Sequence, residues 1–299
     1  MISSALSTTT AVSQWLHTAQ SPRVLHRFDQ VCNLVDAERR VISLVTPEIG
    51  QGPFSLVVDL ANGRLPQLLT AKSQVSIARS TLQIGTLVVD TSKAELWQAR
   101  PLWERVSTDS LKAALPLFER KLAAASPASL AHVDKLSGRS HVMVSRVETA
   151  VYTLQAALKT DKIAAFKKSA QELAGLGAGL TPAGDDFLLG VIYGLWLTAG
   201  CLRSAAETER IVAVLAEEAQ ARTTTLSSAW LCAAARGEAG QAWHGLVQAL
   251  ALTATSSVNA PTNSVDAVSQ AIDRILATGH TSGADAFAGF VMTISTRFI

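Results

Sequence analysis

The chain has 299 residues and a formal net charge of +2, with a charged fraction of 17% and a hydrophobic fraction of 48%. This balance excludes an intrinsically disordered chain, because the apolar surface suffices to offset the loss of chain entropy on folding. It also excludes a dedicated nucleic-acid binder and a polybasic membrane anchor, since both need a strong excess of Lys and Arg.

Alanine and the aromatic residues are used unevenly. Of 48 alanines, 31 lie in residues 151–299, and alanine has the highest helix propensity, so the second half is predicted to be helical. Aromatic residues make up only 5%, which predicts a core built from aliphatic side chains and alanine. Cys32, Cys201 and Cys232 form no disulfide or metal-binding pattern and are expected to be buried free thiols.

Closely spaced β-rich runs fill the first third of the chain. Val31–Val35 and Val41–Val45 flank a polar turn and predict a hairpin. Phe54–Leu60 and Leu82–Asp90 predict further strands, the second with a bulge at Gly85. No element is predicted for the Ser- and Thr-rich start. Such closely spaced strands predict a small barrel or an antiparallel sheet.

The pattern changes to helical near residue 105. Apolar spacing and composition predict helices near 108–125, 141–159, 161–174, 182–199, 204–221, 225–236, 239–253, 264–277 and 283–296. We therefore expect an α+β protein with a β-rich N-terminal domain over residues 1–105 and an α-helical domain over residues 106–299.

We expect no targeting or membrane-spanning segment in this chain. No positive charge precedes Arg23, whereas a secretory signal needs a basic start. The most apolar stretch, Phe187–Ala199, is shorter than the roughly 20 residues that span a bilayer. We expect a soluble cytoplasmic protein whose remaining apolar surface is covered by a partner or by a second copy in a homo-oligomer.

The most informative segment is the glycine-rich stretch over residues 175–190, with the sequence GLGAGLTPAGDDFLLG. Its first three glycines interrupt a helix-forming sequence, and Thr181 followed by Pro182 predicts an N-cap and the first residue of a helix. A glycine-rich loop that leads into a helix presents free backbone N–H groups at the positive end of the helix dipole. That geometry is typical of anion binding.

A second segment, residues 279–289, repeats the first. In an alignment without gaps, each of three residues in the first segment matches one in the second. Gly184 matches Gly283, Asp186 matches Asp285, and Gly190 matches Gly289. Small residues recur every four positions along both predicted helices and therefore share one face. We expect the two helices to pack side by side through this face, with their loops meeting at one pocket.

Three interpretations of this feature remain open. The loops could bind a phosphate or carboxylate that the aspartates help to order, the aspartates could coordinate Mg²⁺, or the feature could be a purely structural duplication. No cofactor is expected under the first, and Mg²⁺ under the second. The candidate catalytic residues are Asp185, Asp186, Asp285 and His280. The candidate substrate-binding residues are Gly177, Gly179, Thr181, Gly184, Thr281, Ser282 and Gly283. Arg139 is a further candidate for an anion contact.

The segment Gly177–Gly190 (GAGLTPAGDDFLLG) resembles the AllH-like family, described as a subunit of oxamate carbamoyltransferase in anaerobic allantoin degradation. Members of that family also carry a later Gly-His-(Ser/Thr)-Ser-Gly-x-Asp segment, here Gly279–Asp285, and a loop with Gly-Pro, here Gly52-Pro53. The resemblance spans roughly residues 25–295.

The resemblance implies an enzyme subunit that exchanges oxalurate and phosphate with oxamate and carbamoyl phosphate. It also implies partner subunits, one of them similar to the acyl-CoA synthetase α fold. Carbamoyl transfer needs donors for an oxyanion and for phosphate, which two glycine-capped helix N-termini would provide. The alternatives are a Mg-dependent hydrolase of phosphate or nucleotide-type substrates and a non-catalytic binding or scaffold subunit.

Overall fold

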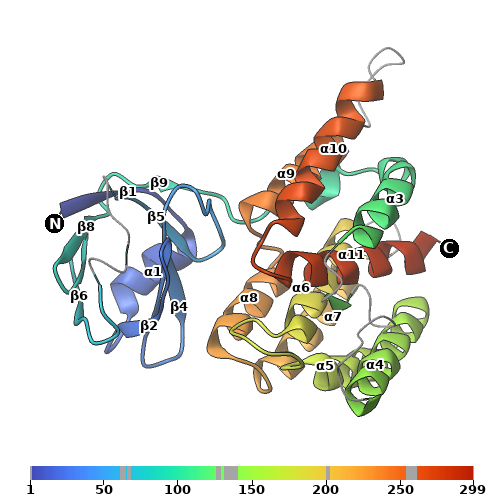
Figure 1. Cartoon of the computed structure of the whole chain (residues 1–299), viewed down its shortest axis with the longest axis horizontal. Helices are drawn as coiled ribbons and strands as arrows, with labels where there is room; N and C mark the ends of the chain where they lie inside the picture. The colour runs from blue at the N-terminus through green and yellow to red at the C-terminus, as the bar shows by residue number, and fades with distance from the viewer. Residues whose placement is uncertain are drawn as a thin grey trace. The chain divides into compact units, whose positions relative to one another are not determined.

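The computed structural model describes residues 2–60, 65, 69–125, 129–130, 141–199, 203–253 and 261–298. The chain divides into two compact units, residues 1–100 with 239–241, and residues 101–238 with 242–299. The first unit consists of strands and one helix, and the second is helical (Figure 1). The expected α+β class, with strands first and helices after them, is confirmed.

The strands of the first unit form one barrel-like sheet. They are β1 (Ile2–Thr8), β2 (Arg23–Arg27), β3 (Val31–Val35), β4 (Val41–Val45), β5 (Ser55–Asp59), β6 (Val75–Ala78), β7 (Thr81–Ile84), β8 (Leu87–Asp90) and β9 (Glu95–Leu96). Their order is β2-β3-β4-β5-β1-β8-β7-β6, and β9 pairs with β1. Arg23 of β2 forms a bridge with Gln74, directly before β6, so the two edges of the sheet nearly close on each other.

Of the two arrangements predicted from the sequence, a small barrel or an antiparallel sheet, the barrel-like one is found. The hairpin β3–β4 is found, but β1 runs parallel to β8 and β4 parallel to β5, so the sheet is mixed and not antiparallel throughout. The single strand expected over Leu82–Asp90 is the end of β7 and all of β8. Gly85 has a φ of +56° and forms a tight turn between them instead of a bulge, because Ile84 pairs directly with Leu87.

The Ser- and Thr-rich start, for which no element was predicted, is ordered. It forms β1 and α1 (Thr10–Thr18), and the Thr9 side chain caps α1 by accepting a hydrogen bond from the Val12 amide. Val12 and Trp15 of α1 pack into the core of the barrel. Strand β1 alternates buried and exposed residues, but Ser3 and Ser7 are among its inward residues, so hydrophobicity alone does not reveal the strand.

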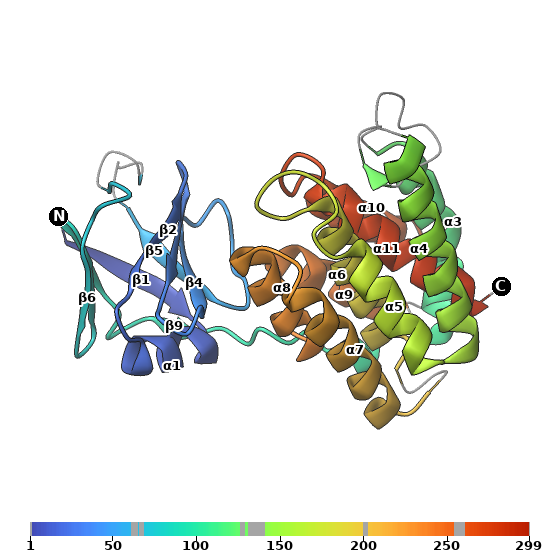
Figure 2. The ribbon, with the colours of Figure 1, turned by 90° about the horizontal axis from the view of Figure 1, so that it is seen from below.

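The helices of the second unit lie close to their predicted positions. They are α3 (Thr108–Ala123), α4 (His141–Thr160), α5 (Ile163–Leu173), α6 (Ala183–Leu197), α7 (Ala205–Gln220), α8 (Thr225–Ala235), α9 (Gln241–Thr253), α10 (Pro261–Leu276) and α11 (Ser282–Phe298), preceded by the 3₁₀ turn η1 (Trp103–Arg105). Helices α6 and α11 form the centre: α6 contacts α5, α7 and α8, and α11 contacts α3, α4 and α10 (Figure 2). All of α6 except Leu189 is buried, as an all-round apolar helix requires.

Helices α6 and α11 pack against each other through glycine, as predicted. A Cβ atom on Gly190 would overlap the carbonyl oxygen of Ala286, and one on Gly289 would overlap that of Phe187. These two contacts correspond under the 99-residue offset between the repeated segments. A Cβ atom on Gly194, one turn further along α6, would overlap the side chain of Thr293, one turn beyond Gly289 on α11. The helices therefore run parallel and are related by an approximate two-fold axis, and their backbones touch where Gly190 and Gly289 lie.

Most buried side chains of the helical unit are aliphatic or alanine, as expected. Six of its aromatic side chains form one connected cluster, in which neighbouring ring centroids are 4.8–5.9 Å apart. The cluster consists of Trp103, Phe118, Tyr193, Trp243, Phe287 and Phe290. The scarce aromatic residues are thus concentrated around α6 and α11, where large side chains fill the space beside the glycine contacts.

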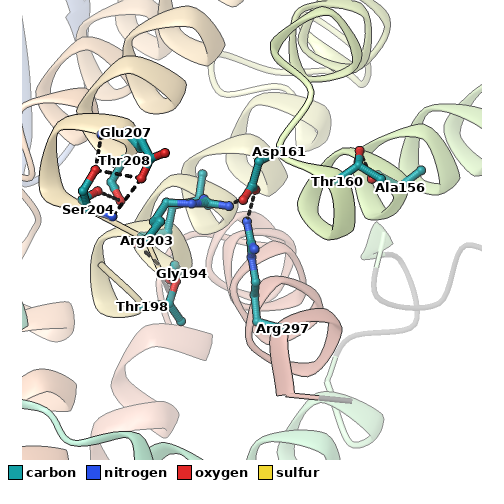
Figure 3. A network of polar contacts seen from close by, with 11 residues as sticks. Ala156, Thr160, Asp161, Gly194, Thr198, Arg203, Ser204, Glu207, Thr208 and Arg297 are labelled. Atoms are coloured by element: carbon teal, nitrogen blue, oxygen red, sulfur yellow. Dashed lines mark hydrogen bonds and ion pairs between the residues drawn. The ribbon is translucent and has the colours of Figure 1, made fainter. Parts of the chain in front are cut away.

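The C-terminal end of the helix pair is held by ion pairs. Oδ1 of Asp161, which follows α4, accepts hydrogen bonds from Nη2 of Arg203 and Nη2 of Arg297 (Figure 3). The side chains of the two arginines are only 3% and 9% exposed, whereas that of Asp161 is 44% exposed. Arginines at this end also suit the negative ends of the helix dipoles of α6 and α11.

The cysteines and the hydropathy of the helices agree with the sequence as far as they are described. Cys32 is buried, Cys232 is half-buried, and both are free thiols, while Cys201 lies outside the described residues. Burial raises the pKa of Cys32 to about 12. No helix in the described part of the chain has the length and apolar character needed to cross a bilayer.

Candidate functional site

The loops that precede α6 and α11 meet at the N-terminal end of the helix pair. The hydroxyl oxygens of Thr181 and Ser282, 101 residues apart in the chain, lie 3.0 Å from each other. Parallel packing of the two helices causes this, because it brings both N-termini to the same end. The expected meeting of the two glycine loops is therefore found.

Glycine is required at specific points of the first loop. Gly175, Gly177 and Gly179 all have positive φ angles, of +72°, +118° and +103°. A Cβ atom on Gly177 would lie 2.8 Å from the backbone nitrogen of Ala183, and one on Gly175 would overlap the carbonyl oxygen of Arg222. The loop can therefore lie close to the start of α6 and to the turn before α8 only with glycine at these positions.

The two loops close with the same hydrogen bond. The amide of Gly184 donates to the carbonyl of Leu176 over 2.9 Å, and that of Gly283 donates to the carbonyl of Thr278 over 3.0 Å. In both cases the glycine also packs against a carbonyl near the C-terminal end of the preceding helix, α5 or α10. The repeat thus extends beyond the loops to the units α5–loop–α6 and α10–loop–α11.

The start of α6 differs from the predicted cap. The N-cap is Pro182, which has no capping side chain, and the Thr181 hydroxyl points to Ser282 across the helix pair. The amides of Asp185 and Asp186 donate to the carbonyl of Pro182, so the first amides of the helix are already bonded. Within the described residues, the amides at positions 177–179 donate to no acceptor of the chain.

Asp185 orders the first loop. Its Oδ1 accepts a hydrogen bond from the Gly175 amide over 2.8 Å, and its Oδ2 accepts one from the Thr223 hydroxyl. Burial raises the pKa of Asp185, although both hydrogen bonds favour the charged form. The Thr224 hydroxyl donates to the carbonyl of Leu180 over 2.6 Å, which adds a second connection from the start of α8. No sequence motif identifies these two threonines as partners of the loop, although the Thr run before α8 marks a helix start.

Asp285 has a similar ordering function in the second copy. It is fully buried, and its Oδ1 accepts hydrogen bonds from the Ser129 hydroxyl over 2.7 Å and from the Leu130 amide over 2.6 Å. Both donors are more than 150 residues away in the sequence, and no motif marks them, so sequence reasoning could not find them.

Asp186 is the third carboxyl group at this end of the helix pair. The residue is only 7% exposed, and its Oδ2 has no hydrogen-bond partner among the described residues. Burial, together with the negative charges of Asp285 and Asp185, raises the pKa of Asp186 to about 8 against the opposing effect of the Ser282 and Thr181 hydroxyls. At neutral pH this carboxyl group is therefore mostly protonated.

The other candidate residues are placed as follows. His280 is exposed in the loop before α11 and makes no hydrogen bond to the aspartates in the part of the chain described here. The carbonyl of Thr281 accepts the amide of Asp285 over 2.8 Å. Arg139 lies outside the described residues. Among those residues, no group of three or more His, Cys, Asp or Glu side chains is arranged to hold a metal ion.

Two comparisons with known families match this chain. Residues 173–294 match the family described as oxamate carbamoyltransferase subunit AllH, and residues 4–96 match the AllH family N-terminal domain. The first match contains both loops and the central helix pair, and the second contains the barrel-like sheet. No solved structure matches the chain. Because the two matches together cover most of the sequence, the chain belongs to the AllH family.

Proposed function

We propose that this chain is a subunit of a carbamoyltransferase that exchanges oxalurate and phosphate with oxamate and carbamoyl phosphate. Membership of the AllH family supports the coarser part, a carbamoyltransferase-related subunit of allantoin degradation that works with partner subunits. The observation that carries the finer part is the meeting of the two glycine loops at Thr181 and Ser282.

In this proposal the paired loops bind the phosphate or carboxylate group of the substrate. The free amides at positions 177–179 and the hydroxyls of Thr181 and Ser282 supply the hydrogen bonds, and the dipoles of α6 and α11 favour negative charge at this end. No Lys or Arg occurs in residues 175–186 or 278–285, so backbone and hydroxyl donors supply the recognition. The proposed substrate-binding set is Gly177, Gly179, Thr181, Gly184, Thr281, Ser282 and Gly283, with His280 as an exposed candidate beside it.

A binding experiment tests the loop assignment. Phosphate and oxamate are titrated separately into the full-length protein by calorimetry, and the measurement is repeated with the double variant Thr181→Val, Ser282→Ala. We expect the double variant to bind at least about tenfold more weakly, since a lost hydrogen bond to a charged ligand is worth about 1.5–3 kcal/mol. The control Thr153→Val removes an exposed hydroxyl from α4 and should leave the affinity unchanged. Equal affinity of the double variant and the control would contradict the assignment.

An activity assay tests the reaction. The chain, alone and together with candidate partner subunits, is supplied with oxalurate and phosphate, and carbamoyl phosphate formation is measured. Product in at least one combination is expected, and absence of product in all of them would remove the proposal. Each combination is assayed with Mg²⁺ and with a chelator, because Mg²⁺ bound at the aspartates is still an untested prediction.

A further inference from the structure

Asp186 and Asp285 occupy equivalent positions at the starts of α6 and α11, but their surroundings differ. Asp285 accepts hydrogen bonds from Ser129 and Leu130 and holds that segment in place. The donors beside Asp186 are the hydroxyls of Thr181 and Ser282 in the two loops, and its Oδ2 is buried without a partner among the described residues. The two copies of the repeat therefore differ in the donors that surround the equivalent aspartates.

The surroundings of Asp186 favour its neutral form. Among the described residues, the charged groups that act on it are Asp185 on its own helix and Asp285 on α11, and both are negative. Of those residues, the hydroxyls of Thr181 and Ser282 favour its ionised form, and the two loops contain no Lys or Arg. A buried carboxylate without a cation or sufficient donors is costly, so the group keeps its proton. No described residue forms a hydrogen bond with Oδ2, so a proton on this oxygen is not shared with an acceptor in the described part of the chain.

The proposed reaction needs a proton at one defined atom. A phosphate oxygen attacks the carbamoyl carbon of oxalurate, the bond from that carbon to the bridging nitrogen breaks, and the nitrogen departs with oxamate. An amide nitrogen departs poorly as an anion and must gain a proton as the bond breaks. Monohydrogen phosphate loses one proton when its oxygen forms the new bond, so the reaction as a whole neither takes up nor releases protons.

We propose that Asp186 donates the proton to the departing nitrogen and takes up the one that phosphate loses. The carboxyl group gives its proton to nitrogen and becomes a carboxylate, which the Thr181 and Ser282 hydroxyls stabilise until phosphate returns a proton. In the opposite direction the same steps run backwards. This inference rests on the proposed function, but the storage of the proton can be measured without any substrate.

The first test determines the protonation state of Asp186 in the full-length protein. Infrared difference spectra compare the wild type with Asp186→Asn across pH 5 to 10. We expect a neutral carboxyl band at pH 7 that is missing in the variant and disappears with a midpoint near pH 8. As a control, Asp90→Asn removes a half-buried carboxylate whose pKa is lowered by hydrogen bonds from Ser92, and it should leave this band intact. An ionised Asp186 at pH 7 would overturn the inference.

The second test uses the active assembly with its partner subunits. Asp186→Asn should lower kcat about 10²–10⁴-fold while phosphate affinity stays within about twofold, because the amide keeps the shape but cannot release a proton. In the wild type, kcat/KM should fall as pH rises through about 8, and this fall should be absent from the residual activity of the variant.

The outcomes separate the two proposals. Undiminished kcat in Asp186→Asn overturns the proton transfer and leaves the proposed function intact. If no assembly forms carbamoyl phosphate, the proposed function fails, whereas the infrared titration still decides whether Asp186 stores a proton. Failure of Asp186→Asn to fold would also count against the inference, since a site built for a neutral carboxyl group accepts an amide.

Discussion

The two ends of the α6–α11 pair carry side chains of opposite charge, and at each end the charge suits the helix dipoles. Acidic residues lie at the N-terminal end and arginines at the C-terminal end, as the helix dipoles favour. At the C-terminal end the opposite charges are in direct contact, because Asp161 pairs with both arginines. At the N-terminal end, Asp185 and Asp285 accept hydrogen bonds from amides and hydroxyls, and Asp186 has one oxygen without a partner among the described residues. The comparison contrasts an end held by direct ion pairs with the end at which we propose that a ligand binds.

The largest expected effect on stability comes from the close glycine contact between α6 and α11. Gly190→Ala places a methyl group on the backbone of α11 and should lower the free energy of unfolding by about 3 kcal/mol, measured by urea denaturation. The matched control is Gly245→Ala in α9, where a Cβ atom would meet nothing within 4 Å. This control should be stabilising by about 0.5–1 kcal/mol, since alanine has the higher helix propensity. Similar effects of the two substitutions would show that the close contact does not hold the pair together.

Removal of the central charge at the C-terminal end should have the next largest effect. Asp161→Asn leaves two buried guanidinium groups without their carboxylate and should cost about 2 kcal/mol, less than a fully buried pair because Asp161 is half-exposed. Asparagine tolerates the left-handed φ of +54° at this position, so the substitution tests the charge and not the backbone.

The control for this change is Asp266→Asn, an exposed position of α10, which should alter stability by less than about 0.5 kcal/mol. Urea denaturation at low and high salt gives a further check, because the Asp161 contribution should decrease with salt. A loss equal to that of the control would mean that the ion pairs contribute nothing to this end.

The smallest expected effect comes from the donors that order the N-terminal end. Thr223→Val removes the hydroxyl that donates to Oδ2 of Asp185 and should cost about 1–2 kcal/mol in urea denaturation at pH 7. Thr153→Val on α4 is again the matched control. If Thr223→Val costs no more than the control, Asp185 does not depend on this donor, and the loop is held by its glycines alone.

The sequence predicts the features that repeat locally and misses those that need distant partners. The spacing of Gly184, Asp186 and Gly190 and its repetition 99 residues later predicted that two helices pack closely with adjacent N-termini, which the structure confirms. The partners of the aspartates could not be predicted in this way. Ser129 and Thr223 reach the site only through the tertiary fold, and nothing in their local sequence indicates an acceptor.

Errors of local interpretation have physical reasons too. The Thr181 hydroxyl was expected to cap α6, but it lies 3.0 Å from the hydroxyl of Ser282 on the other helix, and the N-cap is Pro182. At Gly85 the same residue type suits both a bulge and a tight turn, and only the pairing of Ile84 with Leu87 distinguishes them. Because small polar residues lie on the inward face of β1, its sequence shows no hydrophobic alternation that would predict a strand.

Strand β1 also has a consequence for synthesis of the protein. It is translated before both of its neighbours in the sheet, β5 and β8, and the second of these ends at Asp90. At about 5–20 residues per second, β1 waits several seconds for its second neighbour. An unpaired strand is prone to aggregate during that time when it is strongly apolar. The Ser- and Thr-rich sequence of β1 thus lowers the tendency of the nascent chain to aggregate while β1 is unpaired and the rest of the barrel is being translated.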